Sequence, residues 1–149
     1  MATAKMTNNQ GRLIGIDVGG KRVGLARSDP FNTFASTIGT YSPDDSYKEI
    51  EKQAELAGPI CGFVVGWPLT PQGNRTHATG LVEDYIKKLN KKFPGIETYM
   101  VDERYSSRDA RRILVESGVP KKKRSEKGRV DQAAAAYLLQ QFLESNPTI

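Results

Sequence analysis

Three acidic positions in this chain could bind a metal ion, and Asp17 is the first of them. It follows the largely apolar run Leu13–Ile16 and precedes Gly19-Gly20-Lys21-Arg22, so it lies at the end of a predicted strand, just before a turn. A carboxylate among apolar residues is costly to bury unless something pairs with it. Two roles are open: Asp17 accepts hydrogen bonds from the amides of its own turn, or it binds a cation.

The other two candidates come from distant parts of the chain. Glu103 follows Asp102 at the end of the apolar stretch 96–101, and Asp131 lies at the start of the predicted closing helix. An acid in a first helical turn is also stabilised by the helix dipole, which gives Asp131 a purely structural alternative. Oxygen ligands from Asp17, Glu103 and Asp131, without a His or Cys cluster, favour Mg²⁺ or Mn²⁺ over zinc. Such an ion can activate water to cleave a phosphodiester, so we predict that all three acids are metal-binding and catalytic.

Each acidic candidate has cations beside it in the sequence. The formal charge of +5 is uneven, because residues 104–129 hold ten Lys or Arg against three acids and the rest of the chain sums to −2. Concentrated basicity is typical of a surface that binds a nucleic acid backbone. A solvated charge run and weak surface ion pairs are the alternatives. We expect the substrate to be bound by Lys21, Arg22, Arg104, Arg108, Lys123 and Arg124.

The elements that must position these residues are predicted from spacing. A hairpin covers 13–29, with the positive φ of its turn supplied by glycine, and a third strand covers 34–40. Ser42 caps a helix that starts at Pro43 and stops at Gly58-Pro59. There follow a buried strand over 60–66, an amphipathic helix over 78–89, a strand over 96–101, a helix capped by Ser106, a basic loop over 121–129 and a helix over 130–145.

This order predicts an α/β protein with a five-stranded mixed sheet. The hairpin requires antiparallel strands 1–3, and two helical crossovers require that strands 4 and 5 run parallel, with the first strand in the centre. The pattern matches the three-layer ribonuclease-H-like fold. Because ligands bind beyond the carboxyl ends of parallel strands, Asp17 and Glu103 are expected at the same edge.

Length and composition suit one domain. We expect 149 residues to form a single nuclease domain over 12–145, with tails at 1–11 and 146–149. The only cysteine, Cys61, leaves no disulfide framework, which favours a reducing, cytoplasmic location, and no apolar run indicates membrane association. The only histidine, His77, is expected at the surface.

Several short motifs resemble those of the YqgF (RuvX) family, in the family's order. They are Ile16-Asp17-Val18-Gly19, Arg22-Val23-Gly24, Ser28-Asp29, Gly66-Trp67-Pro68-Leu69 with Gly73, Asp102-Glu103-Arg104, and Asp131 before Ala133-Ala134. The resemblance covers roughly Arg12 to Leu143. Trp67 departs from the pattern, since a small aliphatic residue is more usual there.

The resemblance implies a nuclease that matures the 5′ end of pre-16S ribosomal RNA in ribosome biogenesis. It places Asp17, Glu103 and Asp131 where the family's metal-binding acids lie. A Holliday junction resolvase acting on branched DNA would use the same acids but would need a two-fold dimer, and we expect a monomer or weak dimer. A non-catalytic RNA-binding assembly factor is a further alternative. An actin-like or sugar-kinase ATPase is less compatible, because its nucleotide lies between two domains.

Overall fold

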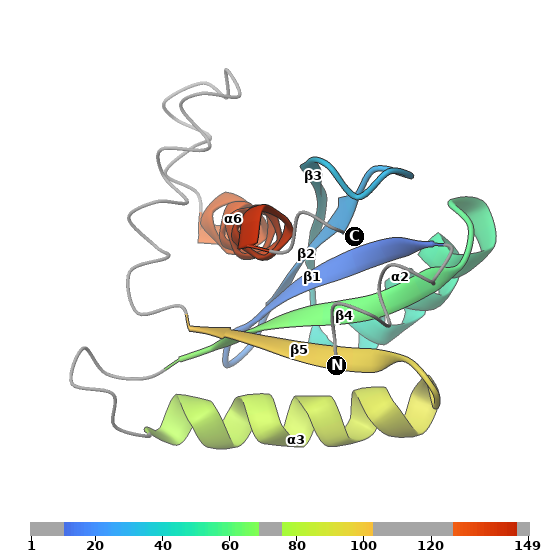
Figure 1. The fold of residues 1–149 in the computed structure, drawn as a ribbon. Coiled ribbons are helices and arrows are strands. Elements are labelled where there is room, and N and C mark those ends of the chain that lie inside the picture. Colours follow the sequence, from blue (N-terminus) through green and yellow to red (C-terminus); the bar gives the residue numbers. More distant parts are fainter. Residues whose placement is uncertain (1–10, 69–75, 103–126, 146–149) are drawn as a thin grey trace.

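The computed structural model describes residues 11–68, 76–102 and 127–145. Five strands form one mixed sheet in the order β3-β2-β1-β4-β5 (Figure 1). β1 pairs antiparallel with β2 and parallel with β4, which confirms the predicted central place of the first strand. The strands are β1 (Arg12–Val18), β2 (Val23–Ser28), β3 (Ala35–Tyr41), β4 (Ile60–Trp67) and β5 (Glu97–Asp102).

Three helices are described, and the start of one corrects a prediction. α2 (Pro43–Leu56) begins as predicted, with the Ser42 side chain accepting the Asp45 backbone N–H at 3.2 Å. α3 (His77–Lys92) follows β4, and its cap is Thr76. α6 spans Lys127–Ser145, so the predicted loop over 121–129 is wrong at its end. Glycine and basic residues are typical of loops, yet those at 127–129 are helical. The helix predicted after Ser106 lies outside the described residues.

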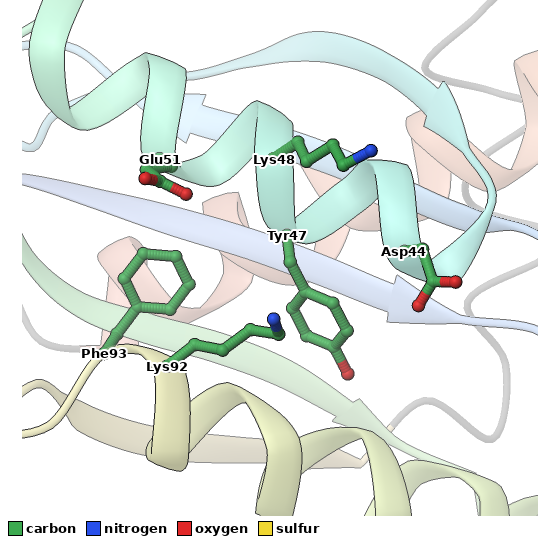
Figure 2. Close-up of a pocket in the computed structure, with 6 residues that line it drawn as sticks. All are labelled: Asp44, Tyr47, Lys48, Glu51, Lys92 and Phe93. Atoms are coloured by element: carbon green, nitrogen blue, oxygen red, sulfur yellow. The ribbon is translucent and has the colours of Figure 1, made fainter.

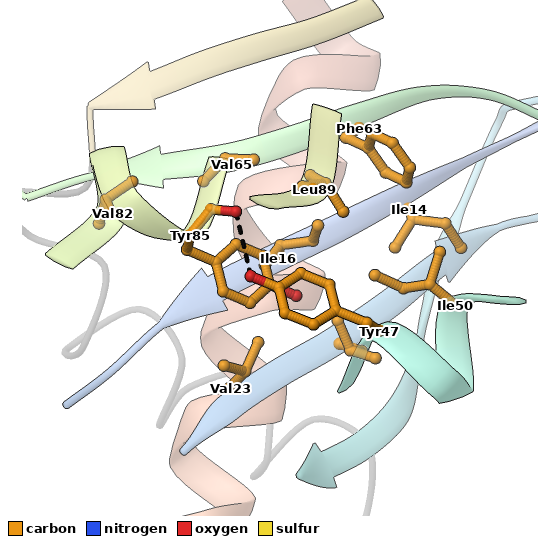
Figure 3. Packing of buried hydrophobic residues seen from close by; sticks show 11 residues of the cluster. Ile14, Ile16, Val23, Tyr47, Ile50, Phe63, Val65, Val82, Tyr85 and Leu89 are labelled. Carbon is orange, nitrogen blue, oxygen red and sulfur yellow. Dashed lines mark hydrogen bonds between the residues drawn. The ribbon is translucent and has the colours of Figure 1, made fainter. Parts of the chain in front are cut away.

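The helices cover the two faces of the sheet, which gives three layers (Figure 1). On one face, α2 and α3 bury an apolar cluster that includes Ile14, Ile16 and Phe63 (Figure 3). On the other face, α6 packs on a second cluster that includes Leu13, Val64 and Ala135. Cys61 belongs to this second cluster, and burial raises the pKa of its thiol, as suits a core residue.

Gly15 lets α6 come very close to the middle of β1. A Cβ atom at this position would lie 2.7 Å from the Ala135 carbonyl oxygen and 2.9 Å from Leu139 Cβ. Such distances are shorter than ordinary van der Waals contact, so a larger residue would push the helix away. The absence of a side chain at Gly15 therefore allows the short distance between α6 and the central strand β1.

The hairpin loop between β1 and β2 differs from the prediction. The described glycines with positive φ are Gly11, Gly58 and Gly95, so Gly19 and Gly20 do not supply a left-handed turn. Gly19 is instead required by space, because a Cβ there would lie 2.8 Å from the Arg22 carbonyl oxygen. Its backbone N–H donates to that same oxygen at 2.8 Å, which closes the loop.

Candidate active site at the carboxyl edge of the sheet

The carboxyl ends of β1, β4 and β5 meet at one edge of the sheet. Ile16 pairs with Val65 across the parallel β1 and β4, and Trp67 pairs with Asp102 across the parallel β4 and β5. β1 and β5 are separated only by β4, or about 10 Å at the usual strand spacing. The residues that end these strands can therefore contribute to one site.

Asp17 lies on the face of the sheet that α6 covers. Side chains alternate along a strand, and Leu13 and Gly15 both meet α6, so Asp17 belongs to the same side. Its direct partner on β2 is Gly24, and the pairing of Ile16 with Val65 makes Gly66 its neighbour on β4. Neither neighbour has a side chain. The half-buried Asp17 therefore lies between two residues that have no side chain, a placement that local sequence patterns do not reveal.

The backbone of Asp131 comes to the same edge from the other end of the chain. Gln140 accepts from Ala35 N–H at the start of β3, and Gln132 accepts from Thr40 near its end, so α6 runs antiparallel to β3. Because β1 and β3 both pair antiparallel with β2, α6 also runs antiparallel to β1. From the crossing of Gly15 and Ala135, two residues forward reach Asp17 and four residues back reach Asp131. These steps are about 6.6 Å of strand and about 6 Å of helix.

A row of paired residues supports the same placement. Asp17 pairs with Gly24, Gly24 pairs with Thr40, and the Thr40 hydroxyl donates to Gln132 Oε1 at 3.3 Å. Gln132 directly follows Asp131 in α6. The segments that carry Asp17 and Asp131 are therefore brought to one edge, although they lie far apart in the sequence.

The position of Asp131 within its helix weakens the structural alternative for this acid. α6 starts at Lys127, and its first turn contains no acidic residue, so the prediction that Asp131 lies in the first turn is wrong. The stabilising effect of a helix dipole on an acid falls off beyond the first turn. The dipole is thus a poor reason for an acid at this position.

The other predicted site residues are described to different extents. Lys21 is exposed and Arg22 half-buried, and both lie in the hairpin loop that follows Asp17. Glu103, Arg104, Arg108, Lys123 and Arg124 lie outside the described residues, as does the side chain of Asp131. Among the side chains that are described, no group of three His, Cys, Asp or Glu could hold a metal ion.

The chemistry at this edge nevertheless fits a hard divalent cation. Asp17 offers carboxylate oxygens beside two glycines, and the Asp131 backbone reaches the same edge. Such oxygen donors suit Mg²⁺ or Mn²⁺, which are bound through one or a few carboxylates and water. The only histidine, His77, is the exposed first residue of α3 and belongs to a different element from Asp17 and Asp131.

A hollow lies on the opposite face of the sheet, away from α6. It measures about 620 Å³ and is lined by Asp44, Tyr47, Lys48 and Glu51 of α2 and by Lys92 and Phe93 at the end of α3 (Figure 2). Lys48 forms a 3.9 Å ion pair with Asp45, and Lys92 Nζ lies 5.4 Å from the Tyr47 ring centre. Two acids and two lysines in its lining balance one another, so this hollow is not a concentrated acidic or basic site.

Comparisons with known proteins agree over nearly the whole chain. The family described as "RuvX: Holliday junction resolvase" matches residues 11–145. A protein of Salinibacter ruber named "Putative pre-16S rRNA nuclease" is 44% identical over 91% of this chain and 94% of its own length. A protein of Chlorobium luteolum with the same name is 42% identical over 92% of this chain and 96% of its own length.

Solved structures confirm the predicted ribonuclease-H-like fold. RuvC of T. thermophilus in complex with a Holliday junction substrate aligns with a TM-score of 0.58 at 14% identity, covering 93% of this chain and 97% of its own. The fowlpox virus Holliday junction resolvase aligns with a TM-score of 0.52 at 10% identity, covering 90% and 98%. None of the described helices is long and apolar enough to cross a membrane.

Proposed function

The chain belongs to the RuvX family, and on that premise we propose that it is a nuclease that hydrolyses phosphodiester bonds. Its substrate is the 5′ end of precursor 16S ribosomal RNA, and it acts in the cytoplasm as a single domain over 12–145. The observation that carries this proposal is the approach of Asp17 and α6 at the carboxyl edge of the sheet. The names of relatives that are more than 40% identical over nearly their full lengths support the choice of RNA.

In this proposal, Asp17, Glu103 and Asp131 hold Mg²⁺ or Mn²⁺. When bound, the ion lowers the pKa of a bound water and stabilises the charge that develops on the phosphate oxygens. The strand that carries Asp17, β1, is paired on both sides, and the neighbours of Asp17 across the sheet are Gly24 and Gly66. Tyr99 and Val101 belong to the α6 side of β5, and Glu103 comes two residues after Val101 in the sequence.

The cations of the chain bind the phosphate backbone. Lys21 and Arg22 lie in the loop that follows Asp17, so they can contact the phosphates next to the one being cleaved. Arg104, Arg108, Lys123 and Arg124 belong to the segment with the largest excess of positive charge. Contacts of this kind hold the strand in place without reading its sequence.

Resolution of Holliday junctions is the second candidate function. It is favoured by the description of the family that matches residues 11–145. Cutting a four-way junction symmetrically requires two active sites related by a two-fold axis. A resolvase is therefore expected to be a dimer when bound to junction DNA, whereas an RNA end-processing enzyme can work as a monomer.

One side-by-side assay tests the proposal. The parent protein, Asp17→Asn and the control Asp29→Asn are incubated with precursor 16S RNA and with junction DNA, each in Mg²⁺ and in Mn²⁺. The parent and the control should cleave the RNA, and Asp17→Asn should cleave at least about 100-fold more slowly while still binding it. Cleavage of junction DNA but not of RNA would favour the second candidate function, the resolution of Holliday junctions, over RNA processing. Equal cleavage by Asp17→Asn would contradict the proposed site.

A further inference from the structure

A small hollow lies directly under the hairpin loop, at the same edge as Asp17 but on the opposite face of the sheet. It measures about 230 Å³, and its lining includes Val18 and Gly19, the two residues after Asp17. Pro43 of α2 and Leu81 of α3 make its apolar walls. The loop that follows Asp17 therefore forms part of the lining and connects the edge that carries Asp17 to this hollow.

Two stacked and hydrogen-bonded tyrosines form the floor of the hollow. The Tyr47 and Tyr85 rings stack with centres 4.6 Å apart, and the Tyr47 hydroxyl donates to the Tyr85 carbonyl at 3.1 Å (Figure 3). Tyr85 also shares a 2.8 Å hydrogen bond with the Ser46 hydroxyl. Burial and then the charge of Asp44 raise the pKa of Tyr47 to about 12, so this phenol remains neutral at physiological pH. Both hydroxyls are used within the protein, which leaves an apolar floor.

Two charged residues of α3 stand at the rim. Asp84 and Lys88 are exposed and lie one helical turn apart among the lining residues. Within the described part of the chain, neither takes part in an ion pair. A carboxylate can accept hydrogen bonds from the amino group of a base, and an ammonium group can contact a phosphate. The rim thus offers the Asp84 carboxylate to a base and the Lys88 ammonium group to a phosphate.

Gly20 keeps the loop side of the hollow open. A Cβ at this position would meet nothing within 4 Å, and its φ lies outside the left-handed region. Neither packing nor backbone conformation in the described structure requires glycine here. A glycine at this position leaves room for a ligand to approach the backbone closely.

We propose that this hollow binds one unpaired nucleobase of the strand whose phosphate lies at Asp17. The inference rests on the proposed nuclease function, and it adds that the substrate must be single-stranded beside the cleaved bond. The volume limits the size of the occupant, because 230 Å³ is below the roughly 300–1,000 Å³ of sites for larger ligands and has room for one planar ring system. An unstacked base can be held in such a site by apolar walls and a few polar groups.

Binding to inactive protein tests this inference without relying on cleavage. Asp17→Asn is titrated with a single-stranded RNA of about twelve nucleotides and with copies that lack one base each. Loss of the base at one position should weaken binding roughly tenfold or more, and loss at the other positions should weaken it less. Equal losses at every position would overturn the inference.

Two variants that fill the hollow test whether the hollow is the site that recognises the base. Gly20→Val adds bulk from the loop, and Leu81→Trp adds it from α3, each in the Asp17→Asn protein. Both should bind the intact RNA as weakly as Asp17→Asn binds the sensitive abasic copy. Leu56→Trp is the matched control, because Leu56 is 73% exposed at the end of α2. If both filled variants retain the preference for the intact base, the hollow is not the site.

Failure of this inference and failure of the proposed nuclease function give different results. Cleavage by the parent without any base preference in binding would leave the proposed function intact and remove this inference. A base preference that both filled variants abolish, in a protein that cleaves nothing, would support the base site and contradict the nuclease.

Discussion

Two aspartates next to loops, Asp17 and Asp29, show how differently the same residue type is used in this chain. Asp29 Oδ1 accepts the backbone N–H groups of Thr33 at 2.6 Å and Phe34 at 2.7 Å, and Oδ2 accepts that of Phe31 at 3.3 Å. Asp29 thus performs the turn-holding role that was one alternative for Asp17. In the hairpin loop, the first amide, that of Gly19, donates to the Arg22 carbonyl oxygen instead.

The two aspartates also differ in the residues that surround them. The Asp29 loop is ordered by polar contacts, since its two aromatic residues, Phe31 and Phe34, are 82% and 67% exposed. Gln140 of α6 reinforces it by accepting the Ala35 N–H at 2.9 Å. Asp17 lies at the opposite end of the sheet, between glycines and under α6. The hydrogen bonds of Asp29 account for a structural role, whereas a functional role for Asp17 stays a prediction.

The largest effect on stability is expected from Gly15→Ala. The new methyl group would lie 2.7 Å from the Ala135 carbonyl oxygen, so α6 must shift away from β1. We expect the free energy of unfolding to fall by about 2–3 kcal/mol and cleavage to fall with it, because Asp131 moves away from Asp17. Urea unfolding and the cleavage assay measure both changes.

Gly20→Ala is the matched control for that substitution. A Cβ at Gly20 would meet nothing within 4 Å, so stability should change by no more than about 0.5 kcal/mol. Equal stability of the two alanine variants would show that α6 does not approach β1 as closely as described.

Asp29→Ala should destabilise the fold without abolishing cleavage. It removes the acceptor of three backbone N–H groups in a partly exposed loop, which we expect to cost about 1–2 kcal/mol of unfolding free energy. Thermal unfolding and the cleavage rate below the melting temperature are the measurements. A loss of cleavage as large as that of Asp17→Asn would remove the distinction between the two aspartates.

The stability conferred by Asp29 should depend on pH in the acid range. Burial, the largest single influence, raises the pKa of Asp29, but hydrogen bonds from Phe34, Thr33 and Phe31 together outweigh it and lower the pKa below 3.8. A lowered pKa in the folded state means that the stabilisation is present above about pH 4 and is lost as the pH falls through the folded value. The difference in stability between the parent and Asp29→Asn should therefore shrink on acidification. A constant difference between pH 6 and pH 2 would contradict the described hydrogen bonds.

Lys21→Ala should give the smallest effect. Loss of one phosphate contact lowers the salt dependence of RNA binding by about one unit of slope and weakens binding only several-fold. Lys52→Ala is a suitable control, because Lys52 is exposed on α2 and outside the proposed site. Titrations at several salt concentrations measure the slope. Equal slopes for the two variants would remove Lys21 from the substrate-binding residues.

The strand order could be predicted from the sequence because crossover lengths and turn signals restrict the topology. The cap of α2 was equally predictable, since Ser42 and Pro43 are local signals. The start of α6 was not, because its glycine and basic residues are also typical of loops. Glycines are ambiguous for a similar reason, and the role of Gly19 turned out to be steric and not conformational.

The candidate site was predictable only in its residue types. Strand-end positions suggested that Asp17 and Glu103 lie at one edge, but the path of α6 could not be read from local patterns. That path depends on long-range contacts, namely Gly15 with Ala135 and Thr40 with Gln132. The glycines beside Asp17 were missed because strand register decides which residues become neighbours across a sheet.

Binding of Mn²⁺ to the parent, Asp17→Asn and Asp29→Asn tests the central claim most directly. Calorimetric titration without any nucleic acid separates metal binding from cleavage and from substrate choice. We predict that Asp29→Asn binds Mn²⁺ with the affinity of the parent and that Asp17→Asn binds it at least about tenfold more weakly, because an amide oxygen is a poorer ligand than a carboxylate. Unchanged Mn²⁺ affinity in Asp17→Asn, in a protein that remains folded, would contradict a metal site at this edge of the sheet.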